Sequence, residues 1–185
     1  MNALEELLKQ IDEGKQFTYL HFWGHKQRSL EVDKACLSQW FVAPFKIDDI
    51  TYPTAEHYMM AGKARLFDDQ VVLKEILTTN DPDIVKRLGR KVKNYDESTW
   101  VEHRSQIVVD GNYAKFSQNP KLAKYLLSTA DRIIVEASPL DKIWGTGLAQ
   151  DHPDSNSPHL WQGLNLLGFA LMEVRHKLLV EQMNY

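Results

Sequence analysis

The feature that most constrains the fold is the return of apolar residues at helical spacing, in segments that proline, glycine and asparagine interrupt. The clearest predicted helix runs from residue 158 to residue 183. Its apolar stripe consists of Leu164, Leu167, Leu171, Val174 and Leu178. Shorter helices are predicted at residues 3–12, 54–67, 68–79, 82–93 and 120–128, and another begins at Asp96 or Ser98.

Predicted strands are few and short. Residues 17–23 and 132–137 are rich in β-forming side chains, and residues 50–52 follow a turn at Asp48-Asp49. A chain of 185 residues has the usual length of one domain and is long enough to bury a continuous core. The pattern therefore predicts a mainly α fold, a single compact helix-rich domain with a few short β-strands.

Composition excludes several classes of protein. The longest apolar stretch, Leu166 to Met172, is far shorter than the roughly 20 residues that span a bilayer. Cys36 is the only cysteine, so no disulfide can form within the chain. With 22 Lys and Arg against 25 Asp and Glu, the net charge is -3, and nucleic acid would have to bind through a local basic patch. We expect a soluble, cytoplasmic protein without membrane association.

The first candidate site lies at residues 52–65. Glu56 and Lys63 are seven residues apart, so on a helix they share one face, and Glu56 falls in the first turn, where the helix dipole favours a carboxylate. Lys63 has apolar neighbours that could lower its pKa and make it a nucleophile. The alternative is a solvated face on which the lysine side chain extends to water.

The second candidate site follows the strand predicted at 132–137. Asp141 and Trp144 are three residues apart, Trp144 offers a flat face for a base or sugar, and Gly145 would let a ligand approach the backbone closely. The alternative is a tight Gly-Xaa-Gly turn at Gly145–Gly147 with a structural tryptophan.

Two further patterns suit a phosphorylated ligand. Trp100 and Arg104 are four residues apart on one helix face and could stack a ring and bind a phosphate, or could form a core tryptophan covered by an arginine stem. Residues 86–93 hold five basic side chains in eight positions, which indicates a local positive patch or a solvated helix face. His21 and His25 lack a suitable spacing for metal ligation in a strand, and we expect no metal site.

Several motifs occur together along the chain. In order, they are Phe22-Trp23-Gly24, residues 37–45, residues 53–63, Leu88-Gly89-Arg90, Trp100, Lys115-Phe116, Val135-Glu136, Asp141 to Gly145, and Asn165 to Gly168. With these motifs the sequence resembles the YbiA-like, or NADAR, family of N-glycosidases. The resemblance covers residues 17–178, so the family domain takes up nearly all of residues 1–185, with residues 1–14 as an N-terminal helical extension.

The resemblance implies a compact, mostly helical fold and cleavage of an N-glycosidic bond. Two substrate classes are known for the family: ADP-ribose on the amino group of guanine, and phosphoribosylamino-pyrimidine intermediates of riboflavin synthesis. Both join ribose C1 to an exocyclic amine. Carried over by motif position, the expected catalytic residues are Glu56, Lys63 and Asp141. The expected substrate-binding residues are Trp23, Arg90, Trp100, Arg104, Lys115, Trp144 and Gly145.

Two chemical routes fit these residues. Lys63 could hold the opened sugar as a Schiff base, or water could attack an oxocarbenium-like sugar directly, with a carboxylate moving protons in either case. The competing function is a non-catalytic module that binds ADP-ribose or a related nucleotide, and a third is a nucleic-acid-binding module. We expect no cofactor and no obligate protein partner.

Overall fold

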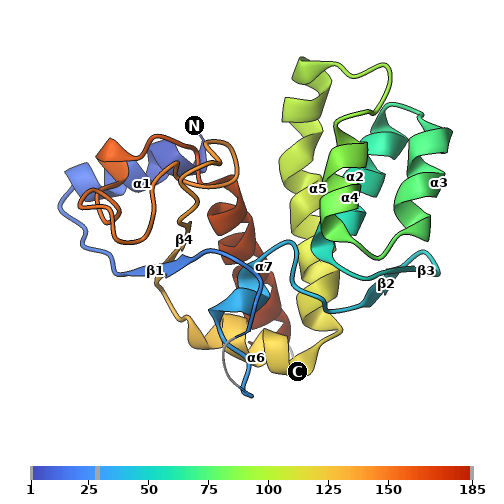
Figure 1. Cartoon of the computed structure of the whole chain (residues 1–185). Helices are drawn as coiled ribbons and strands as arrows, with labels where there is room; N and C mark the ends of the chain where they lie inside the picture. The colour runs from blue at the N-terminus through green and yellow to red at the C-terminus, as the bar shows by residue number, and fades with distance from the viewer. Residues whose placement is uncertain (1, 28–29, 184–185) are drawn as a thin grey trace. The chain divides into compact units, whose positions relative to one another are not determined.

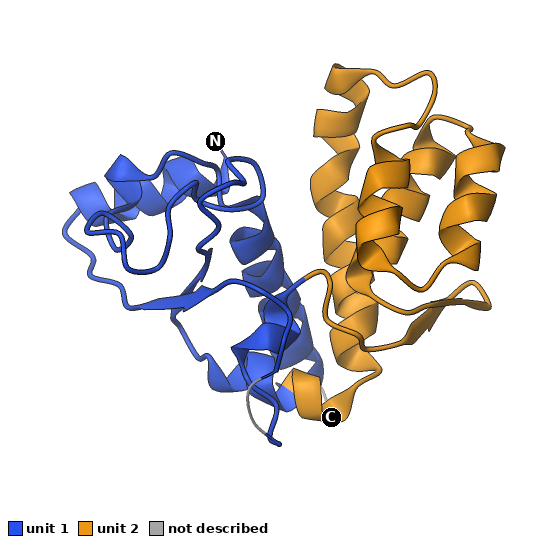
Figure 2. Ribbon diagram, viewed as in Figure 1, with its two compact units in different colours: residues 1–38, 124–185 blue, residues 39–123 orange. Residues whose placement is uncertain are grey.

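The computed structural model describes residues 2–27 and 30–183, which form two compact units (Figure 2). Unit 1 holds the described residues of 1–38 and 124–185, and unit 2 holds residues 39–123. The predicted class is confirmed, because helices dominate and the strands are short (Figure 1). The expected N-terminal helix is α1 (Ala3–Asp12), while Met1 lies outside the described residues.

Unit 1 is built around two parallel strands. Its elements are α1, β1 (Tyr19–Phe22), the 3₁₀ turn η1 (Lys34–Leu37), β4 (Ile133–Glu136), η2 (Pro158–Leu160) and α7 (Leu166–Met183). The first residue of β1 pairs with the first of β4, and the main-chain ladder continues past the strands through Ala137, whose N–H donates to the Phe22 carbonyl at 2.9 Å. Helix α7 packs on β4, and α1 packs on η2. Leu7, Ile133 and Val135 form one of the buried apolar clusters.

Unit 2 is a group of helices beside a small hairpin. Its elements are β2 (Phe45–Ile47), β3 (Ile50–Tyr52), α2 (Ala55–Leu66), α3 (Gln70–Thr78), α4 (Pro82–Gly89) and α5 (Glu97–Ser117), and α6 (Pro120–Ser128) begins in this unit and ends in unit 1. The predicted turn at Asp48-Asp49 is confirmed and joins β2 to β3 with both residues at positive φ. Helix α2 lies at the centre, because α3, α4 and α5 all pack against it.

Helices α2 and α5 approach closely because each presents a glycine to the other. A Cβ on Gly62 of α2 would lie 2.7 Å from the Cγ2 of Ile107, and one on Gly111 of α5 would lie 2.6 Å from the Cδ1 of Tyr58. Both distances are below any normal contact between carbon atoms. Because glycine has no side chain, these two positions let the helices lie close together. The two helices hold most of the candidate residues of unit 2.

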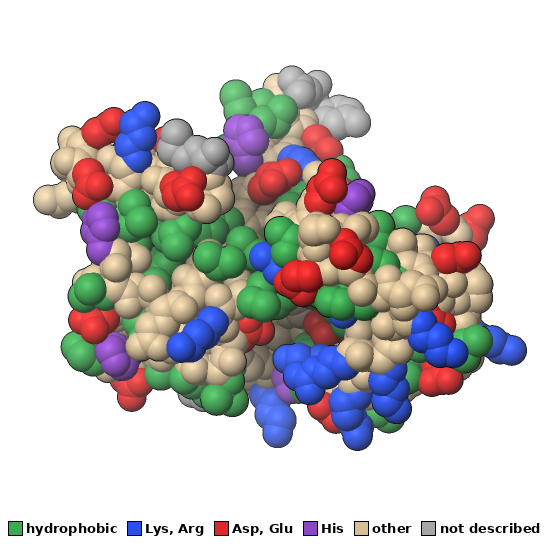
Figure 3. Space-filling model, turned by 90° about the horizontal axis from the view of Figure 1, so that it is seen from above, with side chains coloured by type: hydrophobic (Ala, Val, Ile, Leu, Met, Phe, Trp, Pro, Cys, Tyr) green, Lys and Arg blue, Asp and Glu red, His purple; other side chains and the backbone are tan. Residues whose placement is uncertain are grey.

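Two predicted helices are shorter than the sequence indicates. Helix α4 ends at Gly89 rather than at residue 93, because the Lys93 N–H donates to Asp69 at 2.9 Å and draws the chain onto the start of α3. Only the first half of the basic stretch 86–93 is therefore helical. Arg87, Arg90, Lys91 and Lys93 are exposed, and Figure 3 shows Lys and Arg side chains gathered over the part of unit 2 that holds α4.

The helix predicted from residue 158 begins only at Leu166. Asn165 has a positive φ of 51°, and its side chain bonds to β4, accepting from the Glu136 N–H and donating to the Ile134 carbonyl. A side chain that bonds to a neighbouring strand in this way competes with helix formation. Leu164, assigned to the apolar stripe, is outside the helix and exposed. Within the described residues, no helix has the length and apolar character needed to cross a membrane.

Gly111→Ala tests the close approach of α2 and α5. Alanine favours a helix over glycine by about 1 kcal/mol, but its methyl group would press on the Tyr58 ring, and overpacking costs about 1–3 kcal/mol. The difference gives a net loss of about 1 kcal/mol in the free energy of unfolding, measured by urea denaturation. Ser105→Ala, on the exposed face of the same helix, should stay within about 0.5 kcal/mol of the wild type. Equal stability of Gly111→Ala and the wild type would contradict the tight packing.

Candidate active site

The N-terminus of α2 is held by a buried hydrogen-bonded cap. Thr54 is the N-cap residue, and its Oγ1 accepts from the His57 N–H and lies 2.8 Å from His57 Nδ1. His57 Nε2 donates to the Thr79 carbonyl at 3.0 Å, so Nδ1 accepts the Thr54 hydroxyl proton in the neutral ring. Burial lowers the pKa of His57, and the hydrogen bond to Thr79 offsets part of this lowering. The net lowered pKa favours the neutral ring. The first turn of α2 is thereby fixed to the end of α3.

Glu56 lies in this fixed first turn. Its side chain is 6% exposed, and its main-chain N–H donates to the Gln39 carbonyl at 3.0 Å. The expectation that Glu56 falls in the first turn of a helix is confirmed, and the positive end of the helix dipole favours a carboxylate there. A buried carboxylate held in one place is suited to proton transfer.

Lys63 lies two turns further along α2, against two aromatic rings. Its Nζ is 4.3 Å from the centroid of the Tyr95 ring and 5.4 Å from that of the Trp100 ring. Burial lowers the pKa of Lys63, while the charge of Glu97 acts in the opposite direction. Lys63 is half-buried with its ammonium over two aromatic faces, and whether it acts as a nucleophile or as a snorkelling surface lysine stays a prediction. We call Lys63, Tyr95 and Trp100 the aromatic cage.

Tyr95 is the residue of this cage that the sequence analysis missed. Its hydroxyl donates to Glu97, and burial, followed by that hydrogen bond, raises the pKa of Tyr95 to about 12. A detectable signal did exist in the sequence. Asp96 caps α5, so Tyr95 occupies the position before the cap and Trp100 the fourth helical position, the spacing at which two apolar residues commonly pack together.

The predicted pair Trp100 and Arg104 lies on one face of α5, as the spacing indicates. Trp100 is 7% exposed and Arg104 is 8% exposed. The positive charge of Arg104 lowers the pKa of Tyr95, against the larger upward effects. Lys63 and Trp100 are brought together in unit 2, and Arg104 lies one turn after Trp100 on α5.

Two further candidates of unit 2 have different surroundings. Arg90 is exposed at the C-terminal end of α4. Lys115 is fully buried, and its Nζ lies 5.1 Å from the centroid of the Phe116 ring and 5.7 Å from that of Phe41. A phosphate-binding role for either residue stays a prediction.

In unit 1, Asp141 holds the turn that carries Trp144. Its Oδ1 accepts the main-chain N–H groups of Ile143 at 2.9 Å and Trp144 at 2.8 Å. The space over Gly145 is filled by the chain itself, because a Cβ there would lie 2.8 Å from the Glu136 carbonyl oxygen. Tight packing of the turn therefore explains the glycine without any ligand. Trp144 is half-buried.

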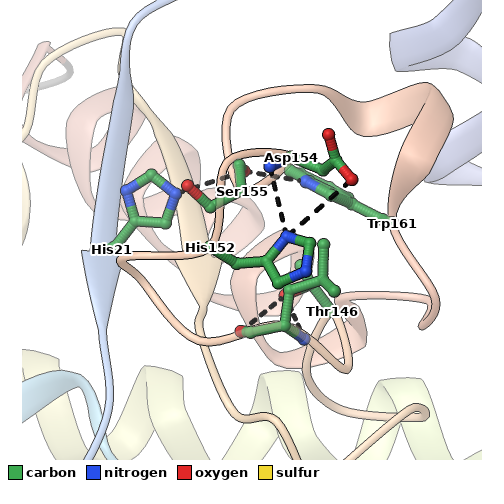
Figure 4. Close-up of polar contacts among 7 residues, drawn as sticks. His21, Thr146, His152, Asp154, Ser155 and Trp161 are labelled. Atoms are coloured by element: carbon green, nitrogen blue, oxygen red, sulfur yellow. Dashed lines mark hydrogen bonds and ion pairs between the residues drawn. The ribbon is translucent and has the colours of Figure 1, made fainter.

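The loop that follows this turn is tied to strand β1 (Figure 4). The Ser155 carbonyl accepts from Trp161 Nε1 at 2.9 Å and lies 3.3 Å from His21 Nε2 on β1. Within the loop, His152 Nδ1 accepts the Asp154 N–H at 3.2 Å. Burial lowers the pKa of His21, as does the charge of Lys34, so the ring is neutral and donates from Nε2 to the carbonyl. The remaining candidate, Trp23, directly follows β1 and is 60% exposed.

No metal centre is found in the ranges 2–27 and 30–183, where no three or more His, Cys, Asp or Glu side chains are placed to share an ion.

Comparison with known proteins gives a consistent family. The sequence model of the NADAR domain matches residues 21–179. An N-glycosidase of Acanthamoeba polyphaga mimivirus is 40% identical over 170 residues, covering 89% of this chain and 98% of the viral protein. N-glycosidase YbiA of Escherichia coli is 31% identical over 174 residues, covering 94% of this chain and 97% of that protein.

A solved structure agrees with these sequence matches. The NMR structure of E. coli YbiA superimposes with a TM-score of 0.74 at 30% identity, covering 92% of this chain and 90% of that one. A maize chloroplast protein named riboflavin biosynthesis protein PYRR is 34% identical over 139 residues, which cover 71% of this chain and 20% of the maize protein.

Asp141 offers a test that separates its structural role from any chemical one. Asp141→Asn keeps an oxygen that can accept both main-chain N–H groups, whereas Asp141→Ala removes it. We expect Asp141→Ala to lower the free energy of unfolding by about 1 kcal/mol and Asp141→Asn to change it by less than about 0.5 kcal/mol, as measured by denaturant titration. If both variants are equally unstable, the carboxylate charge, and not the acceptor oxygen, maintains the turn.

Proposed function

The chain belongs to the NADAR domain family of N-glycosidases, and we propose that it hydrolyses the bond between ribose C1 and an exocyclic amine. It is a hydrolase acting on N-glycosyl compounds, and the N-glycosidase relatives imply a small-molecule substrate. The observation that carries the proposal is the position of Lys63 on α2, with its ammonium over the Tyr95 and Trp100 rings, two turns from the buried Glu56. A module that only binds nucleotides is not favoured, because the full-length relatives are named as N-glycosidases.

Two substrates satisfy this chemistry. One is ADP-ribose joined to the amino group of guanine, in a nucleotide or in nucleic acid, and the other is a phosphoribosylamino-pyrimidine. The name of the maize relative supports keeping the second class. We infer a cytoplasmic location from the single cysteine, Cys36.

We favour a route through a Schiff base on Lys63. The exocyclic nitrogen expels the ring oxygen, which takes up a proton, and C1 becomes an imine. The neutral amine of Lys63 adds to C1 and gives up a proton, the base nitrogen takes up a proton and departs as a free amine, and C1 is then doubly bonded to Nζ. Water adds to that imine and releases the sugar, which restores Lys63. The lowered pKa of Lys63 supports this route, because more of the amine is neutral near pH 7.

The carboxylates are proposed to move the protons. Glu56 would take the proton of the attacking group and return it to the departing amine. Asp141, which belongs to unit 1, stays a predicted catalytic residue, and both of its main-chain hydrogen bonds use Oδ1 rather than Oδ2. The face of Trp100 would stack the base or sugar, and Arg104 would attract phosphate. Trp144 of unit 1 stays a predicted substrate-binding residue.

Glu56 variants, assayed on both substrates, test the proposal. We expect the wild type to release ADP-ribose from an ADP-ribosylated guanosine oligonucleotide, ribose 5-phosphate from a ribosylamino-pyrimidine phosphate, or both. Glu56→Ala should lower kcat by about 10²-fold or more, as the loss of a general acid or base does. Glu102→Gln, an exposed carboxylate on α5, is the matched control and should keep wild-type kcat. Release of neither sugar by the folded wild type would contradict the proposed reaction, and a fewfold loss in Glu56→Ala would leave Glu56 a structural role.

Trapping with borohydride tests the Schiff base. Borohydride added during turnover reduces the imine, so we expect a sugar adduct whose site, located by peptide mass spectrometry, is Lys63. Lys74→Met, on the exposed surface of α3, should leave that adduct unchanged. If no adduct forms and Lys63→Ala turns over at a near-normal rate, the direct oxocarbenium route replaces the Schiff base.

A further inference from the structure

A buried pair of amide side chains, Gln39 and Asn112, connects α5 to the first turn of α2. Gln39 is 8% exposed and Asn112 is fully buried. Asn112 Nδ2, on α5, donates to Gln39 Oε1 at 2.7 Å, and Gln39 Nε2 donates to Met59 Sδ on α2 at 3.6 Å. The main-chain carbonyl of Gln39 accepts the Glu56 N–H at 3.0 Å. One residue therefore joins α5 to the turn that carries Glu56.

The main chain around Gln39 is bound to the start of α2 at two points. The Glu56 N–H is one of the donors at the start of a helix that the helix itself cannot satisfy, and the Gln39 carbonyl accepts it from outside. The Ala43 N–H donates to the Pro53 carbonyl at 3.1 Å, which joins the same two segments a second time. A contact that holds the Gln39 side chain on α5 therefore also holds the start of α2 there.

The amide pair lies at one end of an antiparallel contact between α2 and α5, which run side by side in unit 2 (Figure 1). Residue numbers rise along α2 and fall along α5, because Tyr58 meets Gly111, Gly62 meets Ile107 and Lys63 meets Trp100. The aromatic cage is at the Lys63 end, and Asn112 is at the end where Glu56 lies. The contact between Asn112 and Gln39 therefore limits how far the Glu56 turn can shift along α5.

The orientation of the Asn112 amide is fixed at a cost. Its Nδ2 also donates to the Val108 carbonyl at 2.9 Å, so the nitrogen faces both acceptors. Within the described residues, Asn112 Oδ1 is buried and accepts no hydrogen bond. A buried acceptor without a partner is unfavourable, and apolar side chains in place of both amides would avoid that cost. Proteins accept such local costs mostly at functional sites.

We propose that Gln39 and Asn112 are positioning residues for Glu56 in the hydrolysis proposed above, on which this inference rests. Neither residue is assigned a contact with the substrate. Their hydrogen bonds hold the main chain of the Glu56 turn at one place along α5, so that the carboxylate meets the proton it transfers. Displacement of a reacting group by about 1 Å can cost about 10²-fold in rate, so the pair acts on kcat rather than on KM.

The double variant Gln39→Met/Asn112→Leu tests the proposal, because it replaces both amides with apolar side chains. We expect kcat to fall about tenfold with KM unchanged, while the urea midpoint stays the same or rises. A merely structural pair would lower the midpoint and leave the kcat of the folded protein unchanged. The matched control is Gln118→Met, which removes an amide that bonds the C-terminal end of α5 to Lys46, and it should keep wild-type kcat.

A second measurement shows whether the pair acts through Glu56. In the Glu56→Ala background, the same double variant should change kcat by less than about twofold, because residues that act as a unit are not additive. An equal loss of kcat in both backgrounds, or wild-type kcat in the folded double variant, would overturn the proposal. If the double variant does not fold, Gln39→Met alone, which keeps the length of the side chain, is compared in the same two backgrounds with the same expected results.

Hydrogen exchange separates this inference from the proposed hydrolysis. The Glu56 amide should be protected in the wild type and lose protection in the double variant, whereas the His57 amide, which donates to Thr54, should stay protected. Unchanged protection of the Glu56 amide in the folded variant contradicts the link between the amide pair and Glu56, whatever the activity. If the Glu56 amide loses protection but the wild type releases neither sugar, the link stands and the proposed reaction is what fails.

Discussion

The close approach of α2 and α5 is the constraint on which the candidate chemistry of unit 2 depends. Glycine on both helices allows it, since a Cβ on Gly62 or Gly111 would lie 2.7 or 2.6 Å from a side-chain atom of the opposite helix. Lys63 directly follows Gly62, so the same packing brings its ammonium to the Trp100 ring on α5. The buried Thr54 and His57 cap then fixes the other end of α2, where Glu56 lies. Packing and capping thus position two chemically different groups on one rigid helix.

Local signals in the sequence predict most of the fold, because caps and turns are encoded by a few adjacent residues. Thr54 and Asp96 begin helices as expected, and the turn at Asp48-Asp49 lies where its residue types indicate. The errors occur where distant segments compete with local propensity. Asn165 bonds to β4 instead of continuing a helix, and Asp69 binds the Lys93 N–H and ends α4 early. Neither contact can be recognised from apolar periodicity.

The candidate site was predictable in part for the same reason. Helical spacing places Trp100 and Arg104 on one face, and it places Lys63 on the helix that begins beside Glu56. Tyr95 was missed because it lies outside any helix, although its spacing from Trp100 fits a known packing at helix starts. For Gly145 the sequence left open a place for a ligand or a tight turn, and the nearby carbonyl oxygens of Glu136 and Asp141 favour the turn. A glycine in a sequence indicates a close approach without showing what approaches.

The surroundings of Lys63 act on its pKa in opposite directions. Burial lowers the pKa, whereas the charge of Glu97 raises it and the two aromatic faces favour the charged ammonium. Attraction between an ammonium and an aromatic face is worth about 0.5–1 kcal/mol at partly exposed sites, and one pKa unit corresponds to about 1.36 kcal/mol. Burial outweighs the opposing effects, and the net direction of the Lys63 pKa is downward. The Glu97 carboxylate also accepts a hydrogen bond from the Tyr95 hydroxyl. In the proposed Schiff-base route, a bound sugar that excludes water from the cage would strengthen the burial effect and so increase the fraction of Lys63 in its neutral, reactive form.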